Sequence, residues 1–182
     1  ATTFADEINE KFILNLYKQV ASFRDIHKQY KDKVGSLLKK QLKLKELEPW
    51  DTTVDLAKTQ IKVNIEQAKK MVLEGLKPLG SDYCSHIKEA FDKNWISWLP
   101  KENKLTGAYS IGGVKGRDKF YILTNFNNTI DAVMTIAHEL GHSMNSYYSV
   151  KHQKVYTETS IFYAEIASIC VETLMVLYFL KK

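Results

Sequence analysis

Apolar residues recur every three or four positions along most of this chain, which is the spacing of amphipathic helices. The pattern predicts a long helix over residues 4–30, interrupted once at most, and a second helix over residues 33–44. Two further helices are predicted over residues 64–76 and 81–95. The first half of the chain is therefore expected to be helical.

Turn and capping residues set the expected ends of these helices. Asn64 and Gln67 stand three positions apart, the spacing of a capping box, and Pro78 ends the helix that they begin. By the same logic Asn128 caps a later helix and places Asp131 at its third position. Such caps satisfy backbone N–H groups that have no partner inside the helix.

The periodicity changes from Gly107 onward. The segments GAYSIGG and KFYILTNF are short and rich in aromatic and β-branched residues, and the glycine-containing VKGRD separates them. This arrangement predicts a β-hairpin within residues 101–127. The expected fold class is mainly α with a small β-hairpin or sheet, that is, α+β.

The segment SIFYAEIASICVETLMVLYFL, residues 160–180, is apolar nearly all the way round a helix. It has the length of a membrane span, which is roughly 20 residues. Glu165 and Glu172 oppose insertion, because each carboxylate costs about 2.5 kcal/mol or more near a bilayer centre. A buried helix is the favoured interpretation, and its carboxylates then require a partner or a metal.

The motif HExxH, formed by residues 138–142, lies on a predicted helix and offers such a metal. Residues four positions apart share one face of a helix, so His138 and His142 can reach a single ion. Glu139 lies one position round the helix and can reach a water on that ion. The alternative is a pair of ordinary surface histidines, which the low charge of the surrounding helix disfavours.

A third protein ligand completes most hydrolytic zinc sites. The pattern HExxHxxGxxH would need glycine at 145 and histidine at 148, but the chain has Asn145 and Tyr148. Glu165 follows the motif in the next helix and is the candidate ligand. Glu172 is two turns further along the same face, and its predicted role is to accept a hydrogen bond from the free ring N–H of a histidine ligand. The alternative for Glu172 is a loosely hydrogen-bonded glutamate that reaches solvent.

The chain has 182 residues and a formal net charge of +5, much of it from residues 31–47. Leucines and valine interrupt these lysines, and neither arginine nor an aromatic residue accompanies them, so a solvated helix face is expected rather than a nucleic-acid site. Cys84 and Cys170 do not make a disulfide framework, which is compatible with the cytosol. The polar start ATTFADEINEKF is not a signal peptide.

Several segments together resemble one enzyme family. Two segments resemble the metal-binding helices of the oligoendopeptidase F branch of the M3 metallopeptidases: AHELGHSMNSYYS, and SIFYAEIAS together with Glu172, which follows Glu165 by seven residues. LTGAYSIGG and KFYILTNFNNTIDAV resemble the strands that precede that site. The resemblance covers most of the chain and is most specific between Gly107 and Glu172.

The resemblance implies a metalloendopeptidase site with one zinc ion per chain, short peptide substrates, and neither nucleic acid nor membrane as a partner. Its zincin-like HExxH helix would pack on the second helix that carries the third ligand. The implied residues are the zinc ligands His138, His142 and Glu165, the general base Glu139, and a peptide-binding strand at Gly107, Ala108 and Tyr109.

Members of that family are several times longer than this chain. We therefore expect residues 1–182 to be a single partial catalytic domain, with a helical region at 1–100, the hairpin region at 101–127 and the metal-binding helices at 128–182. Such a fragment would have little activity and would self-associate through newly exposed surface. Two alternatives are a zinc-binding helical domain without catalysis and a helical interaction or membrane-associated protein whose HExxH is accidental.

Overall fold

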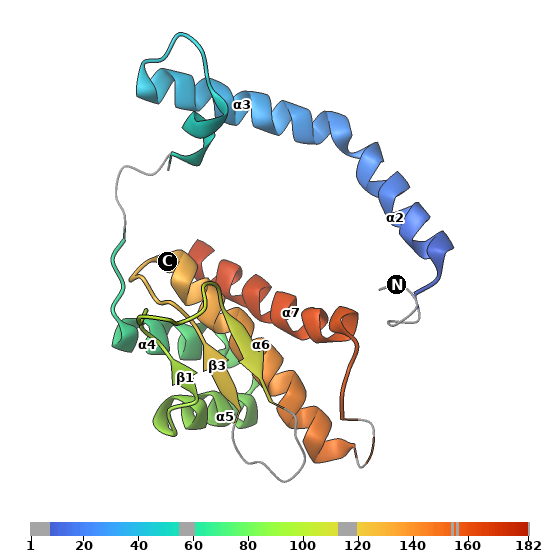
Figure 1. Ribbon diagram of the computed structural model, residues 1–182, viewed down its shortest axis with the longest axis vertical. Coiled ribbons are helices and arrows are strands. Elements are labelled where there is room, and N and C mark those ends of the chain that lie inside the picture. The colour runs from blue at the N-terminus through green and yellow to red at the C-terminus, as the bar shows by residue number, and fades with distance from the viewer. Residues whose placement is uncertain (1–7, 55–60, 113–119, 154, 156, 182) are drawn as a thin grey trace. The chain divides into compact units, whose positions relative to one another are not determined.

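The computed structural model describes residues 8–54, 61–112, 120–153, 155 and 157–181. The chain divides into two compact units, Ala1–Gln60 and Ile61–Lys182, which are described separately (Figure 1). Within the described residues, the first unit is helical and the second combines helices with a small sheet.

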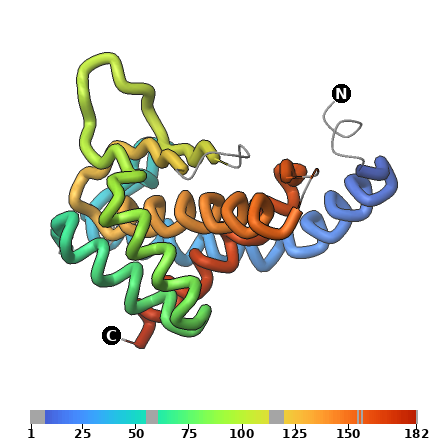
Figure 2. The backbone as a smooth tube through the Cα atoms, turned by 90° about the horizontal axis from the view of Figure 1, so that it is seen from below, coloured from blue at the N-terminus to red at the C-terminus, as the bar shows by residue number. Residues whose placement is uncertain are grey.

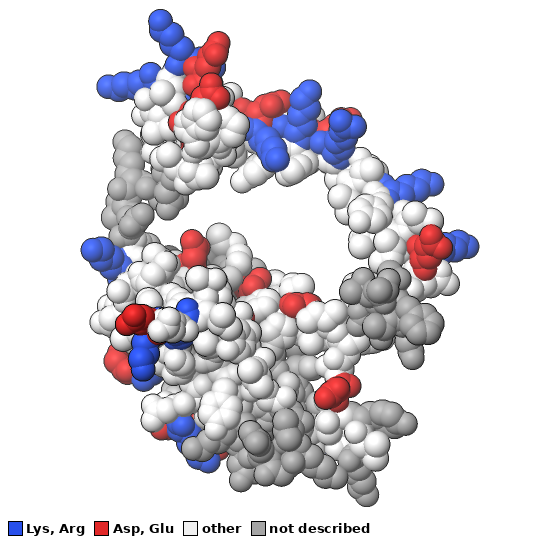
Figure 3. Space-filling model, in the orientation of Figure 1, with Lys and Arg blue, Asp and Glu red and all other residues white. Residues whose placement is uncertain are grey.

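The first unit contains α2 (Glu10–Ser22), α3 (Arg24–Leu42) and the 3-10 helix η1 (Pro49–Thr53). The expected helix boundary near residues 31–32 is wrong, because the chain breaks at Phe23 and α3 then continues through both of those residues. Lys31 and Asp32 are compatible with a helix, so nothing there stops it. The predicted start at residue 4 lies outside the described residues. The lysines of α3 project from its surface, as expected for a solvated face (Figure 3).

The second unit contains α4 (Ile65–Gly75), the 3-10 helix η2 (Lys77–Leu79), α5 (Ser81–Asp92), α6 (Ile130–His152) and α7 (Ile161–Leu180). Its sheet has the order β1-β3-β2, with β1 at Ile96–Ser97, β2 at Tyr109–Ile111 and β3 at Tyr121–Leu123. The helix α6 contacts α4, α5, α7, β2 and β3, and so forms the centre of this unit (Figure 2). The predicted fold class, mainly helical with a small sheet, is confirmed.

The helix caps follow side-chain chemistry, with one departure from expectation. The capping box is present, since the Asn64 side chain accepts from the Gln67 N–H at 2.8 Å and the Gln67 side chain accepts from the Asn64 N–H at 2.8 Å. The prediction that Asn128 caps α6 is wrong, because the cap is Thr129, which accepts from the backbone of Ala132. Asn128 instead takes a φ of 63°, a left-handed conformation that asparagine tolerates, and turns the chain into the helix.

The sheet is a hairpin with one added strand. The predicted antiparallel pairing is confirmed, with Ser110 opposite Ile122, while the connecting residues 113–119 lie outside the described part of the chain. The strand β1 was not predicted, and it pairs in parallel with β3. A strand of two residues is too short to show the alternation on which sequence prediction depends.

The core of this unit lies around α6, between the other helices and the sheet. Its largest fully buried side chains come from the helices, from β3 and from the segment before α4: Val63, Val72, Leu76, Ile87, Ile122, Val133, Ile136, Leu140, Met144, Val171 and Met175. Burial of this apolar surface is the main force that fixes α6 and the hairpin in place.

The helix α7 is only partly buried, in line with the expectation that a partial domain exposes apolar surface. Only Ser168, Val171 and Met175 are buried along its length, and large apolar side chains elsewhere on it are exposed. Within the described residues it is the one helix that is long and apolar enough to cross a membrane, a criterion that core helices of soluble proteins also meet. The narrow buried face is the face that contacts α6 and α4.

Candidate metal centre

The two histidines of the HExxH motif lie together on one side of α6, and both are partly buried. Thr129 caps the start of this helix, Asp131 lies in its first turn, and Lys151 and His152 lie in its last turn, which suits the helix dipole at both ends. The Nε2 atoms of His138 and His142 are 3.0 Å apart. Four-residue spacing has thus brought two imidazole nitrogens to one point on the helix surface.

The neighbouring helix α7 brings Glu165 to the same point. Its Oε2 lies 3.6 Å from Nε2 of His138 and 3.6 Å from Nε2 of His142. Ligands about 2.0–2.1 Å from a tetrahedral zinc ion lie about 3.4 Å from one another. The three observed separations bracket that value, and the donor set of two imidazoles and one carboxylate suits such an ion.

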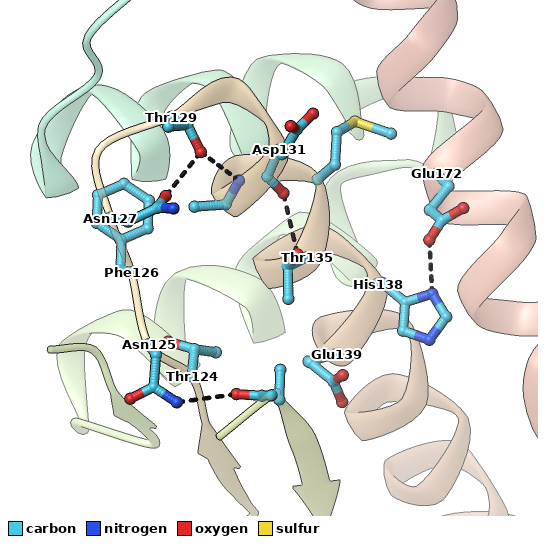
Figure 4. A pocket seen from close by; sticks show the side chains of 14 residues that line it. Thr124, Asn125, Phe126, Asn127, Thr129, Asp131, Thr135, His138, Glu139 and Glu172 are labelled. Atoms are coloured by element: carbon cyan, nitrogen blue, oxygen red, sulfur yellow. Dashed lines mark hydrogen bonds and ion pairs between the residues drawn. The ribbon is translucent and has the colours of Figure 1, made fainter. Parts of the chain in front are cut away.

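Glu172 fixes the orientation of one imidazole from two turns further along α7. Its Oε1 lies 2.7 Å from Nδ1 of His138, so Nδ1–H donates to the carboxylate and the lone pair of Nε2 is directed at the shared point (Figure 4). The backbone of Ala164 forms a hydrogen bond with the His142 ring. Burial lowers the pKa of His142, which keeps its imidazole neutral and able to bind a metal.

Glu139 lies next to this cluster without joining it. Only 6% of its surface is exposed, and its carboxylate is directed into the pocket beside His138 (Figure 4). Burial raises the pKa of Glu139, the charge of Glu165 adds to that increase, and His138 opposes it. A buried carboxylate with a raised pKa beside a metal-binding cluster is suited to accepting a proton.

Two residues that sequence reasoning missed connect α6 to α7 at the cluster. A Cβ atom on Gly141 would lie 2.7 Å from Cα of Ser168, so the two helices approach backbone to backbone here. The hydroxyl of Ser168 lies 2.8 Å from Oε2 of Glu165. Small residues on facing helices were the available signal, but the sequence alone does not show which positions face one another.

A cavity lies on each side of the cluster, and His138 and Glu139 line both. The first has a volume of about 670 Å³ and is bordered by Gly107 and Ala108, and the second has about 500 Å³ and is bordered by Ala108 and Tyr109. Of the three residues expected in a substrate strand, Tyr109 alone belongs to β2, and Gly107 is in a bend with a φ of 85°. All three nevertheless border the space in front of the cluster.

Comparison with known proteins identifies the family of the chain. The sequence model of peptidase family M3 matches residues 1–182. The chain is 48% identical to an oligoendopeptidase F homolog of Mycoplasma pneumoniae over 96% of its own length and 28% of the relative's. It is 41% identical to oligopeptidase PepF of Bacillus subtilis, over 80% of this chain and 22% of that one.

A solved structure gives the same result for the fold. A provisionally assigned peptidase of Chlamydophila abortus superposes with a TM-score of 0.76 at 31% identity, covering 99% of this chain and 29% of that structure. The chain therefore spans less than a third of the length of each of these three relatives. Since the family match extends over the whole chain, the protein belongs to peptidase family M3, a family of metallopeptidases.

Proposed function

We propose that this chain carries the metal-binding half of a zinc endopeptidase that hydrolyses internal bonds of short peptides. The observation that carries the proposal is the convergence of His138, His142 and Glu165, whose donor atoms all lie within 4.8 Å of one another. The relatives are named as oligopeptidases and oligoendopeptidases, which supports peptides as the substrates.

Zinc is the proposed ion because two imidazoles and one carboxylate form a common hydrolytic zinc donor set that leaves one position open. When bound, zinc lowers the pKa of a bound water to about 7 and polarises the scissile carbonyl. Glu172 contributes by accepting the Nδ1–H hydrogen bond of His138, which holds that ring in the metal-binding tautomer. The proposal is one ion per chain.

Glu139 is the proposed general base. It accepts a proton from the attacking water and delivers it to the leaving amine, so the carboxylate is restored at the end of the cycle. Burial raises the pKa of the Glu139 carboxyl above its usual value, which makes the carboxylate a better proton acceptor. Glu139 lines both cavities, which supports this role because the scissile peptide bond is proposed to lie between them.

The proposed substrate path runs along β2 and the two residues before it. In the described part of the sheet, β2 is an edge strand, because β3 separates it from β1. An edge strand offers backbone N–H and C=O groups to an extended peptide, giving affinity with little side-chain selectivity. Cavities on both sides of the cluster leave room for chain in both directions, which favours internal bonds over terminal ones.

We further propose a cytosolic location and weak activity for the 182-residue chain by itself. Residues 1–182 would then act as one partial catalytic domain, with the remaining transition-state donors supplied by the part of the relatives that this chain does not match. Donors to the developing oxyanion are worth about 3–4 kcal/mol each, so their absence reduces turnover by orders of magnitude.

Metal content and hydrolysis are tested separately. Zinc in the purified chain is measured by atomic emission, with His138→Ala as the control that loses it. Hydrolysis of a quenched fluorescent peptide is measured in a chimera in which residues 1–182 replace the matching segment of the Mycoplasma pneumoniae homolog. Glu139→Gln in that chimera should retain zinc and lose about 10²–10⁴-fold in turnover.

Two outcomes would contradict the proposal. A chain that binds no zinc at saturating concentration rules out the metal site, and a Glu139→Gln chimera within twofold of the parent rules out the base. Stoichiometric zinc without hydrolysis in the parent chimera would instead support a zinc-binding helical domain without catalysis.

A further inference from the structure

We propose that Ser168 is a positioning residue for the third metal ligand, and that its hydroxyl holds the Glu165 carboxylate in the orientation needed for binding. This inference rests on the proposed metal site. Ser168 does not touch the shared point of the cluster itself, and acts through Glu165.

The hydroxyl of Ser168 has two acceptors within reach. Its Oγ lies 2.8 Å from Oε2 of Glu165 and 3.0 Å from the backbone carbonyl oxygen of the same residue. A helical serine ordinarily donates to a carbonyl oxygen one turn earlier. The hydroxyl carries one hydrogen, and a charged carboxylate is a stronger acceptor than a carbonyl oxygen. The Glu165 carboxylate therefore receives the hydrogen bond.

The oxygen that receives this bond is the one that matters for the metal. Oε2 of Glu165 is also the atom that lies 3.6 Å from both histidine Nε2 atoms. The Glu165 side chain is 37% exposed, so packing leaves much of it unconstrained. Ser168 is fully buried, and its neutral hydroxyl provides an anchor that does not depend on the charge of either histidine.

The anchor is itself fixed relative to the helix that carries the other two ligands. Gly141, directly before His142 on α6, approaches Cα of Ser168 so closely that a Cβ atom would lie only 2.7 Å away. This close approach fixes the distance between the Ser168 backbone and α6, and with it the position of the Ser168 hydroxyl. Through it, the position of α6 determines where the Glu165 carboxylate stands, although Glu165 belongs to α7.

The test measures metal affinity instead of turnover. Zinc affinity of the full chain is determined by competition with a chromophoric chelator, and the visible spectrum of the cobalt-loaded chain reports ligand geometry. Ser168→Ala should weaken zinc binding roughly 10- to 100-fold and alter the cobalt spectrum. Unfolding of the metal-free variant reports separately on stability.

A matched control is available in Ser143→Ala. Ser143 is equally buried, loses the same atom, and shares its hydroxyl hydrogen bond with Ser110 on β2 at 2.8 Å instead of with a proposed ligand. Its zinc affinity should stay within twofold of the parent chain. If both variants weakened zinc equally, loss of a buried hydroxyl in general would explain the effect and the inference would be overturned.

A double-mutant cycle separates this inference from the proposed site. Glu165→Ala alone should weaken zinc binding strongly, and adding Ser168→Ala should then cost nothing more. An undiminished effect of Ser168→Ala in the Glu165→Ala background would overturn the role of Ser168, as would parental zinc affinity in the single Ser168→Ala variant. If Glu165→Ala itself leaves affinity unchanged, the proposed metal site fails.

Discussion

Replacing Gly141 by alanine tests the close approach of α6 and α7. The new Cβ atom would lie 2.7 Å from Cα and 3.2 Å from the backbone N of Ser168, and 3.2 Å from the carbonyl oxygen of Ala167. Carbon atoms pack best about 3.5–4.0 Å apart, so α7 has to move by roughly 0.8 Å or more. All three obstructing atoms are backbone, so no side-chain rotation can relieve the contact.

Two opposing terms set the expected stability change. Overpacking a well-packed contact costs about 1–3 kcal/mol, and alanine in place of a mid-helix glycine returns about 0.5–1 kcal/mol. The rigid backbone places the cost in the upper part of its range, which leaves a net destabilisation of about 1–2 kcal/mol. This displacement of α7 would move Glu165 by more than the roughly 0.2 Å tolerance of a metal–ligand distance. Zinc affinity should therefore also fall at least about tenfold.

The assay combines denaturant unfolding of the metal-free chain with zinc competition titration. Gly75→Ala is the control, because its Cβ atom would meet the thioether end of Met175, a flexible side chain that can move aside. It should leave zinc affinity at the parental value and cost less stability. Parental stability and parental zinc affinity in Gly141→Ala would refute the reasoning from backbone contact.

Three further predictions follow from other contacts. Glu172→Gln removes the charge opposite His138 and should weaken zinc binding about tenfold in the same titration, whereas a change below twofold would contradict its role. Burial and the hydrogen bond to Asp82 raise the pKa of Tyr148 to about 12, above its unfolded value near 10. The stabilisation that comes with this raised pKa is therefore complete below pH 10 and is lost as the pH rises toward 12. Tyr148→Phe should reduce the drop in unfolding free energy between about pH 9 and pH 11. An equal drop in both chains would exclude this role of Tyr148. The exposed apolar side chains of α7, such as Ile169 and Leu177, should drive self-association that light scattering detects as mass rising with concentration, and a monomer that is stable to dilution would contradict this.

The residues of the cluster could be anticipated because local chemistry constrained them. A four-residue spacing fixes where His138 and His142 lie relative to each other whatever else the chain does. Glu165 could be anticipated for a different reason, since a carboxylate in an apolar helix requires a partner and the motif supplied one. The structure brings these three residues together and places Glu172 against His138, as expected from the seven-residue interval on α7.

Features that depend on packing between distant segments could not be anticipated. The contact between Gly141 and Ser168 is a property of how two helices cross, and neither residue carries a distinctive pattern in its own helix. Which side of α7 is covered could not be predicted from its composition, because that composition is apolar all round and only the neighbouring elements decide which residues are buried. No proline or glycine adjoins the break at Phe23, so the sequence does not indicate its position.

The contact between α7 and α6 has a consequence for local opening of the protein. Val171 and Met175 are the only large side chains of α7 that are fully buried, so detachment of this helix would release little fully buried apolar surface. An ion shared between α6 and α7 would act as a cross-link and be released on detachment. At a free zinc concentration 1,000 times its dissociation constant, it would add about 4 kcal/mol to the opening free energy. Amide hydrogen exchange along α7 should then slow about a thousandfold on metal binding, while exchange in α5 changes far less.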